Sequence, residues 1–316
     1  MNDGSANAAA WQRAQLPARV KENKEMRLLN GGIPIFAVTL AAMAAGAQVS
    51  PDAATEKQRL LETGRTHATA WDLYLSLRAQ SGGGQQAPSF DQLPDWTGLW
   101  SRAPDAFVLF QPEGGESPRF TPEAQRMLAE GRERTAQGNI YDEGISDCGP
   151  PGFPRWLVIP FLREFIVRPE QTWLTSETVN NVRRIYTDGR DHPDEAERYP
   201  LYYGDSIGFW DEGKLVIHTN QLMARYMGRN NLYQSDAIET VEVWETVAED
   251  RIEVDAWIYD PSILEEPWHT RVVYNRVSNP DRSLRVRYWH CTENPNNEVY
   301  ETEEGGTQFR EFLFEE

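Results

Sequence analysis

The chain has 316 residues, a formal net charge of −18 and an aromatic content of 11%. This length allows one large domain or two ordinary ones, and it is enough to bury a sizeable core. So acidic a chain does not fit nucleic acid or an anionic membrane surface, because both partners attract clustered Lys and Arg. The aromatic residues suit a β-sheet core or the walls of a site for a flat apolar ligand.

The N-terminal region has the pattern of a secretory signal peptide. Lys21, Lys24 and Arg27 precede an apolar run from Ile33 to Ala45, and Ala45-Gly46-Ala47 follows the A-x-A cleavage pattern. The run is shorter than the roughly 20 apolar residues that span a bilayer. Residues 1–47 are therefore predicted to be an N-terminal extension and signal peptide, and Met26 is an alternative start. The mature protein is predicted to begin near Gln48, in the periplasm or outside the cell, without stable membrane insertion.

Cysteine usage fits this oxidising location. The chain has only Cys148 and Cys291, far apart in sequence. In an exported protein such a pair predicts one disulfide, which could contribute about 4 kcal/mol by closing a long loop. A free reactive thiol or two buried apolar cysteines are the alternatives. Neither cysteine has a second one at metal-ligand spacing.

Helices and a linker are expected before the main domain. Residues 52–79 have apolar positions spaced for one buried helical face, and the stretch Ser81–Ser89 has the composition of a flexible linker. Residues 48–90 are thus predicted to be a helical segment with a linker, and residues 91–316 to form the main domain. Thr121-Pro122-Glu123 predicts a further helix that ends near Ala136, with Thr121 as N-cap.

The rest of the chain is rich in short β patterns. Ser206–Trp210 and Lys214–Asn220 are predicted to form a hairpin, and Arg251–Tyr259 alternates between apolar and polar positions. Other predicted strands are Trp156–Ile159, Glu164–Arg168, Thr172–Thr175, Val179–Thr187, Ile238–Val247, Trp268–Val277 and Leu284–Cys291. We therefore expect a mainly β fold, an antiparallel calycin-like β-barrel with one or two flanking helices. A twisted open sheet backed by two helices is the alternative.

Titratable side chains concentrate in the stretch from Arg183 to Asp211, which is interpreted as the rim of a pocket. The predicted catalytic residues are His218, His192, Asp205, Arg184, Tyr186 and Arg190. A histidine would move a proton, Asp205 would orient it, and an arginine or Tyr186 would stabilise an oxyanion. The alternatives are a structural Arg–Asp clamp across the turn at Thr187–Arg190 and histidines that are simply surface or core residues.

Other chemistries are less well supported by the sequence. Gly204-Asp205-Ser206-Ile207-Gly208 matches the G-x-S-x-G elbow, but a hairpin follows where that motif needs a helix. No histidines have paired metal-ligand spacing, although a site from separate strands stays open, and no nucleotide-binding loop is present. No metal and no cofactor are therefore predicted. Aromatic residues and one histidine are predicted to line a ligand pocket: Tyr203, Trp210, Tyr226, Tyr233, Trp244, Trp257, Trp268 and His269.

A set of motifs resembles a group of exported bacterial proteins of unassigned function. The motifs are W-x-G-x-W at Trp96–Trp100, C-x-P-x-G-x-P-R at Cys148–Arg155, T-D-G-R-x-H-P at Thr187–Pro193 and G-x-S-x-G at Gly204–Gly208. The resemblance implies a lipocalin-type barrel in bacteria that consume aromatic compounds, some of whose proteins deformylate lignin-derived dimers. Residues Leu222–Gln234 depart from the group pattern.

These patterns together predict a periplasmic barrel that binds a small aromatic or apolar molecule. The favoured activity is cofactor-independent acid–base catalysis by a lyase or isomerase, with lignin-derived aromatics as one candidate substrate class. A non-catalytic, lipocalin-like carrier and an envelope-associated interaction module are the alternatives. A homo-oligomer is compatible with the sequence.

Overall fold

The computed structural model describes residues 51–103, 109–110, 116–138, 145, 148–228, 231–289, 299–301 and 307–309. All of them belong to one compact unit, residues 49–316. The predicted signal peptide and Cys291 lie outside the described residues, so the cleavage site and the disulfide stay predictions.

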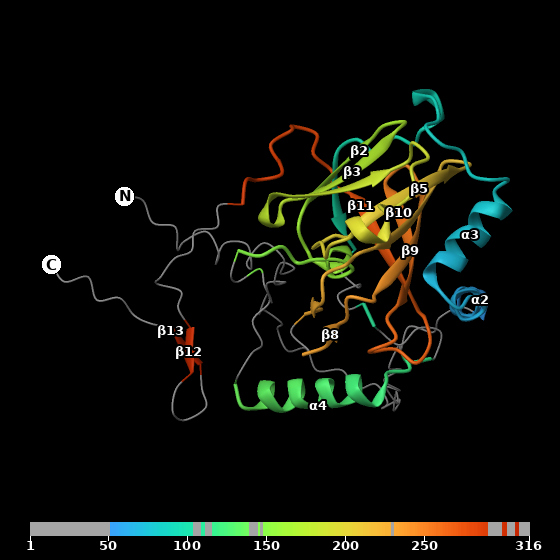
Figure 1. The fold of residues 1–316 in the computed structure, drawn as a ribbon. Coiled ribbons are helices and arrows are strands. Elements are labelled where there is room, and N and C mark those ends of the chain that lie inside the picture. Colours follow the sequence, from blue (N-terminus) through green and yellow to red (C-terminus); the bar gives the residue numbers. More distant parts are fainter. Residues whose placement is uncertain are drawn as a thin grey trace, which may run out of the picture. The chain divides into compact units, whose positions relative to one another are not determined.

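Nine strands form a closed barrel in the order β1-β11-β10-β9-β6-β5-β4-β3-β2, with β2 returning to β1 (Figure 1). Their bounds are β1 Leu99–Arg102, β2 Arg163–Val167, β3 Gln171–Ser176, β4 Asn181–Tyr186, β5 Asp205–Asp211, β6 Lys214–Asn220, β9 Glu239–Ala248, β10 Arg251–Tyr259 and β11 Trp268–Arg276. Neighbouring strands are antiparallel except β4 and β5, which meet in parallel through one residue pair, Tyr186 and Ile207. The predicted fold class, a mainly β barrel with flanking helices, is confirmed, although its strands are not all antiparallel.

Alternation along the strands separates the barrel interior from its outer face. On β10, Ile252, Val254, Ala256 and Ile258 belong to the main core, whereas Trp257 and Tyr259 belong to a second, outer cluster. This is the alternation that the sequence predicted, and it follows from the two-residue period of a strand. Trp96, Trp100, Phe165, Trp244 and Tyr274 pack ring against ring in the main core.

The main core also encloses an ion pair. Arg183 of β4 donates through Nη1 and Nη2 to both carboxylate oxygens of Glu242 on β9, at 2.9 and 2.6 Å. The two side chains are 1% and 0% exposed. Nη2 of Arg183 also donates to Thr219 at 2.7 Å, and the indole of Trp244 donates to Glu242 at 3.0 Å. The surrounding bonds compensate both charges, as burial requires.

Helices α2 (Pro51–Arg65) and α3 (Ala70–Gln80) pack on the outside of the barrel (Figure 1), α3 against β6 and β9 and α2 against β11. The predicted single helix over 52–79 therefore breaks in two. Thr69 starts the second helix, because its hydroxyl accepts the amide of Asp72 at 3.0 Å. The helices cover an outer cluster made of Leu60, Ala70, Leu73, Tyr74, Ile207, Phe209, Val216, Val241, Trp257 and Tyr259.

Helix α4 (Pro122–Ala136) begins at its predicted N-cap, Thr121, which accepts the amide of Ala124 at 3.2 Å. The remaining described elements are short. They are η1 Phe90–Gln92, η2 Arg155–Val158, η3 Thr178–Asn180, η4 Glu195–Glu197, β7 Arg225–Tyr226 paired with β8 Tyr233–Gln234, and β12 Val299–Glu301 paired with β13 Thr307–Phe309. Among the described residues, no helix is long and apolar enough to span a membrane.

Local predictions failed where backbone bonding differs from a strand or a free linker. The expected strand at Trp156–Ile159 is a 3₁₀ turn, because the amides of Trp156 and Leu157 bond back to Gly152 and Pro154. Within Ser81–Ser89, Gln85 exchanges two backbone bonds of 2.8 Å with Trp210 and so adds to the edge of β5. The described part of the expected strand at Leu284–Cys291 contains no strand.

Candidate functional site

Four titratable side chains form a line beneath helix α3, and we call them the acid–histidine chain: Asp205, His192, His218 and Glu239. Nδ1 of His192 lies 2.5 Å from Oδ1 of Asp205, and its Nε2 lies 2.8 Å from Nδ1 of His218. Nε2 of His218 faces Oε2 of Glu239 at 3.4 Å. The line thus joins the loop after β4, the start of β5, β6 and the start of β9.

The acid–histidine chain is positioned by the register of the strands and by helix α3, which covers it. The sequence left open which face of β6 is interior. In the structure Leu215 and Ile217 lie in the main core, so His218 points outward, opposite Ile207 of β5. Trp71 and Tyr74 of α3 lie over it, with ring centroids 5.1 and 5.6 Å from the His218 ring.

Burial determines the electrostatic state of the inner histidine. The His218 side chain is 1% exposed, whereas those of Asp205 and Glu239 are 19% and 35% exposed. Desolvation lowers the pKa of His218 below its ordinary value, and the opposing effect of Glu239 does not outweigh it. The acid–histidine chain therefore has the buried, neutral imidazole of His218 in its interior and a partly exposed carboxylate at each end, Asp205 and Glu239.

The hydrogen bonds define one tautomer for each ring in the neutral chain. An ionised Asp205 only accepts, so Nδ1 of His192 carries a proton and donates to it. Nε2 of His192 is then an acceptor, and Nδ1 of His218 must donate. Nε2 of His218 is left with a free lone pair and has no hydrogen-bond partner among the described residues. A proton between this lone pair and the Glu239 carboxylate would be attracted by both groups, and this attraction partly offsets the effect of burial on the pKa of His218.

A pocket of about 330 Å³ opens at the Glu239 end of the chain, and we call it the Glu239 pocket. It lies at the start of α3, beside the loop that follows β10. Its wall consists of Ala68, Thr69, Ala70, Ala237, Glu239, Tyr259, Asp260, Pro261, Leu264, Glu265, Glu266 and Pro267. Most of these residues are small, aliphatic or aromatic, so the pocket suits a compact and largely apolar molecule.

The other acids in this wall already have partners. Glu266 accepts from Arg65 at 2.6 Å, and Glu265 pairs with Arg119 at 3.5 Å. Asp260 accepts bonds from the amides and hydroxyls of two serines. Glu239 is the carboxylate of this pocket whose side chain contacts only a histidine among the described residues. It is thus the acid that is available for proton exchange with a molecule in the pocket.

The predicted oxyanion residues do not line the Glu239 pocket. Arg190 forms an ion pair with Asp188 at 2.6 Å and stacks on Tyr186, 4.0 Å from Cζ to the ring centroid. This is the clamp that was considered as the structural alternative. Arg184 lies exposed on β4, with its Cζ 5.8 Å from the centre of the Trp173 ring. Of the six predicted catalytic residues, the structure brings His192, His218 and Asp205 into direct contact.

The G-x-S-x-G stretch has a structural part in the barrel. Ser206 is buried and bonds to Thr219 at 2.9 Å and to Arg183 at 3.2 Å, inside the main core. Gly204 has φ +65, and a Cβ there would lie 2.3 Å from the backbone oxygen of Asn220. The stretch turns the chain into β5 and aims Asp205 at His192.

The predicted aromatic ligand residues are spread over three environments. Trp210, Trp244 and Trp268 belong to the main core, and Tyr203 packs against it. Trp257 donates to the carbonyl of Leu60 at 2.7 Å under α2. Tyr226 and Tyr233 pair across the β7–β8 ribbon, with their rings edge to face and the ring centroids 4.8 Å apart. None of these residues lines the Glu239 pocket.

His269 lies apart from the acid–histidine chain. Its Nε2 is 2.9 Å from Oδ1 of Asp255, which also accepts two bonds from Arg271 at 2.7 and 2.8 Å. Burial alone would raise the pKa of Asp255, but the bonds and charges of His269 and Arg271 together lower it. The group stabilises the β10–β11 pair on its outer face.

Sequence reasoning missed Glu239, Trp71 and Tyr74. Glu239 begins a strand that follows a polar turn, which is an ordinary place for an exposed acid. Its closeness to His218 depends on the β6–β9 pairing, in which His218 faces Val241. For Trp71 and Tyr74 the sequence carried a weak signal, because two aromatic residues three positions apart lie on one face of a helix. That this face packs on the hairpin that carries His218 is visible only in the structure.

Comparisons with protein-family models and with curated proteins found no match. Among the described residues, no group of three or more His, Cys, Asp or Glu side chains has the arrangement of a metal site. The class of protein that fold and site define is therefore a closed β-barrel with a buried acid–histidine chain and a pocket at one end of that chain.

Proposed function

We propose that this protein is an exported barrel that binds a small, largely apolar and aromatic molecule and catalyses cofactor-independent proton transfer on it, as a lyase or isomerase. One observation carries the proposal. A line of three contacts joins the pocket wall at Glu239 to Asp205, through two histidines that lack other acidic partners. Acid–base enzymes commonly have titratable side chains in contact with one another beside the substrate pocket.

In this proposal Glu239 removes a proton from the bound molecule and His218 accepts it at Nε2. The proton on Nδ1 of His218 moves to Nε2 of His192, and the proton on Nδ1 of His192 moves towards Asp205. Reversal of the same steps returns a proton to a second atom of an isomerase substrate, or to the leaving group of a lyase substrate. The two contacts of His192, at 2.5 and 2.8 Å, are hydrogen bonds, and the 3.4 Å between His218 and Glu239 has to shorten, or be bridged by a water, when the proton passes.

The cellular location and the disulfide are parts of the same proposal. The basic, apolar and A-x-A sequence up to Ala47 supports export, and two distant cysteines support one disulfide in an oxidising compartment. The resemblance to exported bacterial barrels supports an aromatic substrate, with lignin-derived compounds as the first class to test.

The second candidate is a non-catalytic carrier. Its support is the composition of the Glu239 pocket, whose wall is dominated by alanine, proline, leucine and tyrosine side chains. A carrier would use Glu239 as a single polar anchor for its ligand, and the histidines would only hold α3 on the barrel.

Deuterium exchange distinguishes the two candidates. The mature protein, starting at Gln48, is incubated in D₂O with a mixture of lignin-derived aromatic compounds, and mass spectrometry follows each compound. A proton-transfer enzyme converts at least one compound or places deuterium in it. A carrier retains compounds that stay chemically unchanged and unlabelled.

Substitutions then connect the activity to the acid–histidine chain. His218→Ala and Glu239→Gln should lose labelling while ligand retention stays largely intact, and His192→Ala should slow it. His67→Ala is the matched control, because the His67 side chain bonds to Thr63 and Thr66 near the end of α2, away from the acid–histidine chain. Normal turnover in both His218→Ala and His192→Ala would contradict the proposal.

A further inference from the structure

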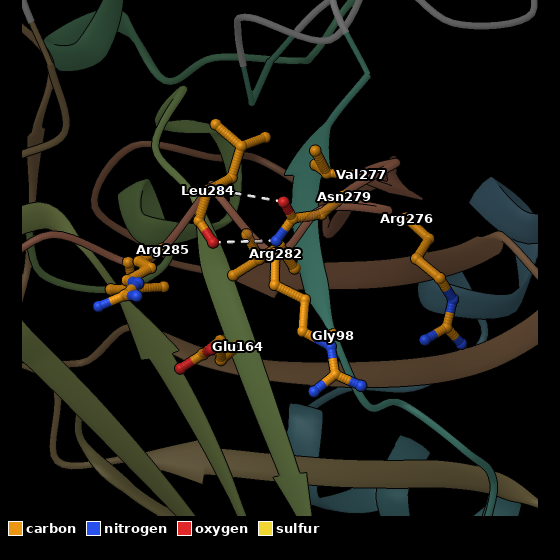
Figure 2. A pocket seen from close by; sticks show the side chains of 10 residues that line it. Gly98, Glu164, Arg276, Val277, Asn279, Arg282, Leu284 and Arg285 are labelled. Carbon is orange, nitrogen blue, oxygen red and sulfur yellow. Dashed lines mark hydrogen bonds between the residues drawn. The ribbon is translucent and has the colours of Figure 1, made fainter.

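A second pocket lies where β1, β2 and the segment after β11 meet (Figure 2). It has a volume of about 530 Å³ and is lined by Gly98, Leu99, Glu164, Arg276, Val277, Asn279, Arg282, Leu284, Arg285 and Val286. We call it the arginine pocket. It shares no lining residue with the Glu239 pocket.

The charge of this pocket is opposite to that of the whole protein. Three arginines, Arg276, Arg282 and Arg285, line it together with one carboxylate, Glu164. In contrast, the chain has a formal net charge of −18. A local excess of positive charge on so acidic a protein attracts an anion to this place and not to the surrounding surface.

Only one of the three guanidinium groups has hydrogen-bond partners among the described residues. Arg276 donates to the carbonyls of Asp95 and Glu249 at 2.9 and 3.1 Å and also contacts the carbonyl of Thr97. Among the described residues, the side chains of Arg282 and Arg285 form no hydrogen bond or ion pair, with Glu164 or with any other residue, whereas the backbone amide of Arg282 donates to the carbonyl of Asn279 at 3.1 Å. Figure 2 shows Arg282 and Arg285 on the two sides of Glu164, with the Arg282 side chain extending towards Gly98.

That segment is held at several points. The side chain of Asn279 donates to the carbonyl of Leu284 at 2.9 Å and accepts its amide at 3.0 Å (Figure 2). The amide of Val277 bonds to Leu99 at 2.7 Å, and further along the amide of Arg287 bonds to Glu177 at 3.0 Å. Arg282 has a φ of +54, an unusual conformation for a residue with a side chain. These bonds hold the backbone of the segment that carries Arg282 and Arg285.

The rest of the wall determines what kind of anion fits. Leu99, Val277, Leu284 and Val286 supply apolar surface beside the guanidinium groups. Arg binds a carboxylate through two parallel hydrogen bonds, and apolar walls favour a ligand body that is also apolar. We propose that the arginine pocket binds a small organic acid, whose carboxylate is attracted by the positive charges of Arg282 and Arg285 and whose apolar body packs on these aliphatic side chains.

Calorimetry with benzoate tests the proposal on the mature protein. Benzoate should bind with a Kd in the millimolar range, and the affinity should fall as salt screens the charges. Benzyl alcohol, which has the same ring without the charge, should give no binding heat that depends on Arg282 or Arg285. Arg282→Gln and Arg285→Gln should each weaken benzoate about tenfold or more, the size expected for one lost charge-assisted hydrogen bond.

Controls separate this site from other effects. Arg132→Gln on α4 removes the same charge from an exposed position and should leave benzoate binding unchanged. Glu239→Gln should not reproduce the loss of binding seen in Arg282→Gln, so failure of the proposed catalysis does not affect this test. Equal binding of benzoate in the wild type and in the Arg282→Gln/Arg285→Gln double variant would overturn the proposal. Tighter binding of inorganic phosphate than of benzoate would overturn the assignment to an organic acid.

Discussion

Breaking the ion pair between Arg183 and Glu242 should cost the barrel a large part of its stability. In Arg183→Met, Glu242 loses both of its guanidinium bonds and keeps only the bond from Trp244 at 3.0 Å. Since its side chain is 0% exposed, water cannot replace the lost partner. We expect a loss of about 3–5 kcal/mol in the free energy of unfolding, the usual effect of leaving a buried charge unpaired.

Urea unfolding followed by circular dichroism measures this loss, and the thermal midpoint should fall by roughly 6–20 °C on the scaling of 2–4 °C per kcal/mol. The double variant Arg183→Met/Glu242→Met should recover much of the loss, because it removes both charges from the core. Arg190→Met breaks the more exposed pair with Asp188 and should change stability by less than about 1 kcal/mol. A loss in Arg183→Met as small as that in Arg190→Met would refute the reasoning.

Three further predictions concern acid, backbone and redox chemistry. Because burial lowers the pKa of His218, the unfolded chain binds a proton more readily, so stability should fall as the pH drops below about 6.5, the ordinary histidine value, towards the lowered folded-state value. Denaturant titrations at pH 7 and pH 5 should show this difference reduced in His218→Asn, and an unchanged difference would assign it elsewhere. Gly204→Ala should lose at least about 1–2 kcal/mol, since its φ of +65 is unfavourable for alanine and Asn220 blocks its Cβ; a midpoint equal to that of the wild type would contradict this. Thiol titration of the unfolded, unreduced mature protein should detect no free thiol if Cys148 and Cys291 form the predicted disulfide, and reduction should lower the thermal midpoint; two titratable thiols before reduction would rule the disulfide out.

Local patterns were enough to predict the barrel strands. The alternation of Ile252, Val254, Ala256 and Ile258 placed one face of β10 in the core, and the turn at Gly213 predicted the β5–β6 hairpin. These signals depend on the period of a strand and on turn chemistry, which neighbouring residues determine. The N-cap signal at Thr121 predicted the start of α4 for the same reason.

The candidate site depends on contacts that no local pattern contains. His192, His218 and Asp205 were predicted from residue type, but their order in the chain and the presence of Glu239 follow from barrel register. Arg183 was interpreted as part of a pocket rim, whereas its partner Glu242 lies on a strand far along the sequence, inside the core. The aromatic residues show the same limit, because composition alone does not distinguish a tryptophan that fills a barrel from one that lines a pocket.

The parallel contact between β4 and β5 is one of two short pairings in the barrel wall, the other being that of β1 with β2. Only Tyr186 and Ile207 pair across it, whereas β5 and β6 pair from Asp205 to Asp211. Local opening needs the least free energy where the fewest backbone bonds must break. His192 is in the connection across the β4–β5 contact and Asp205 is at its edge, so occupancy of the Glu239 pocket and hydrogen exchange at the amides of β5 are expected to be coupled.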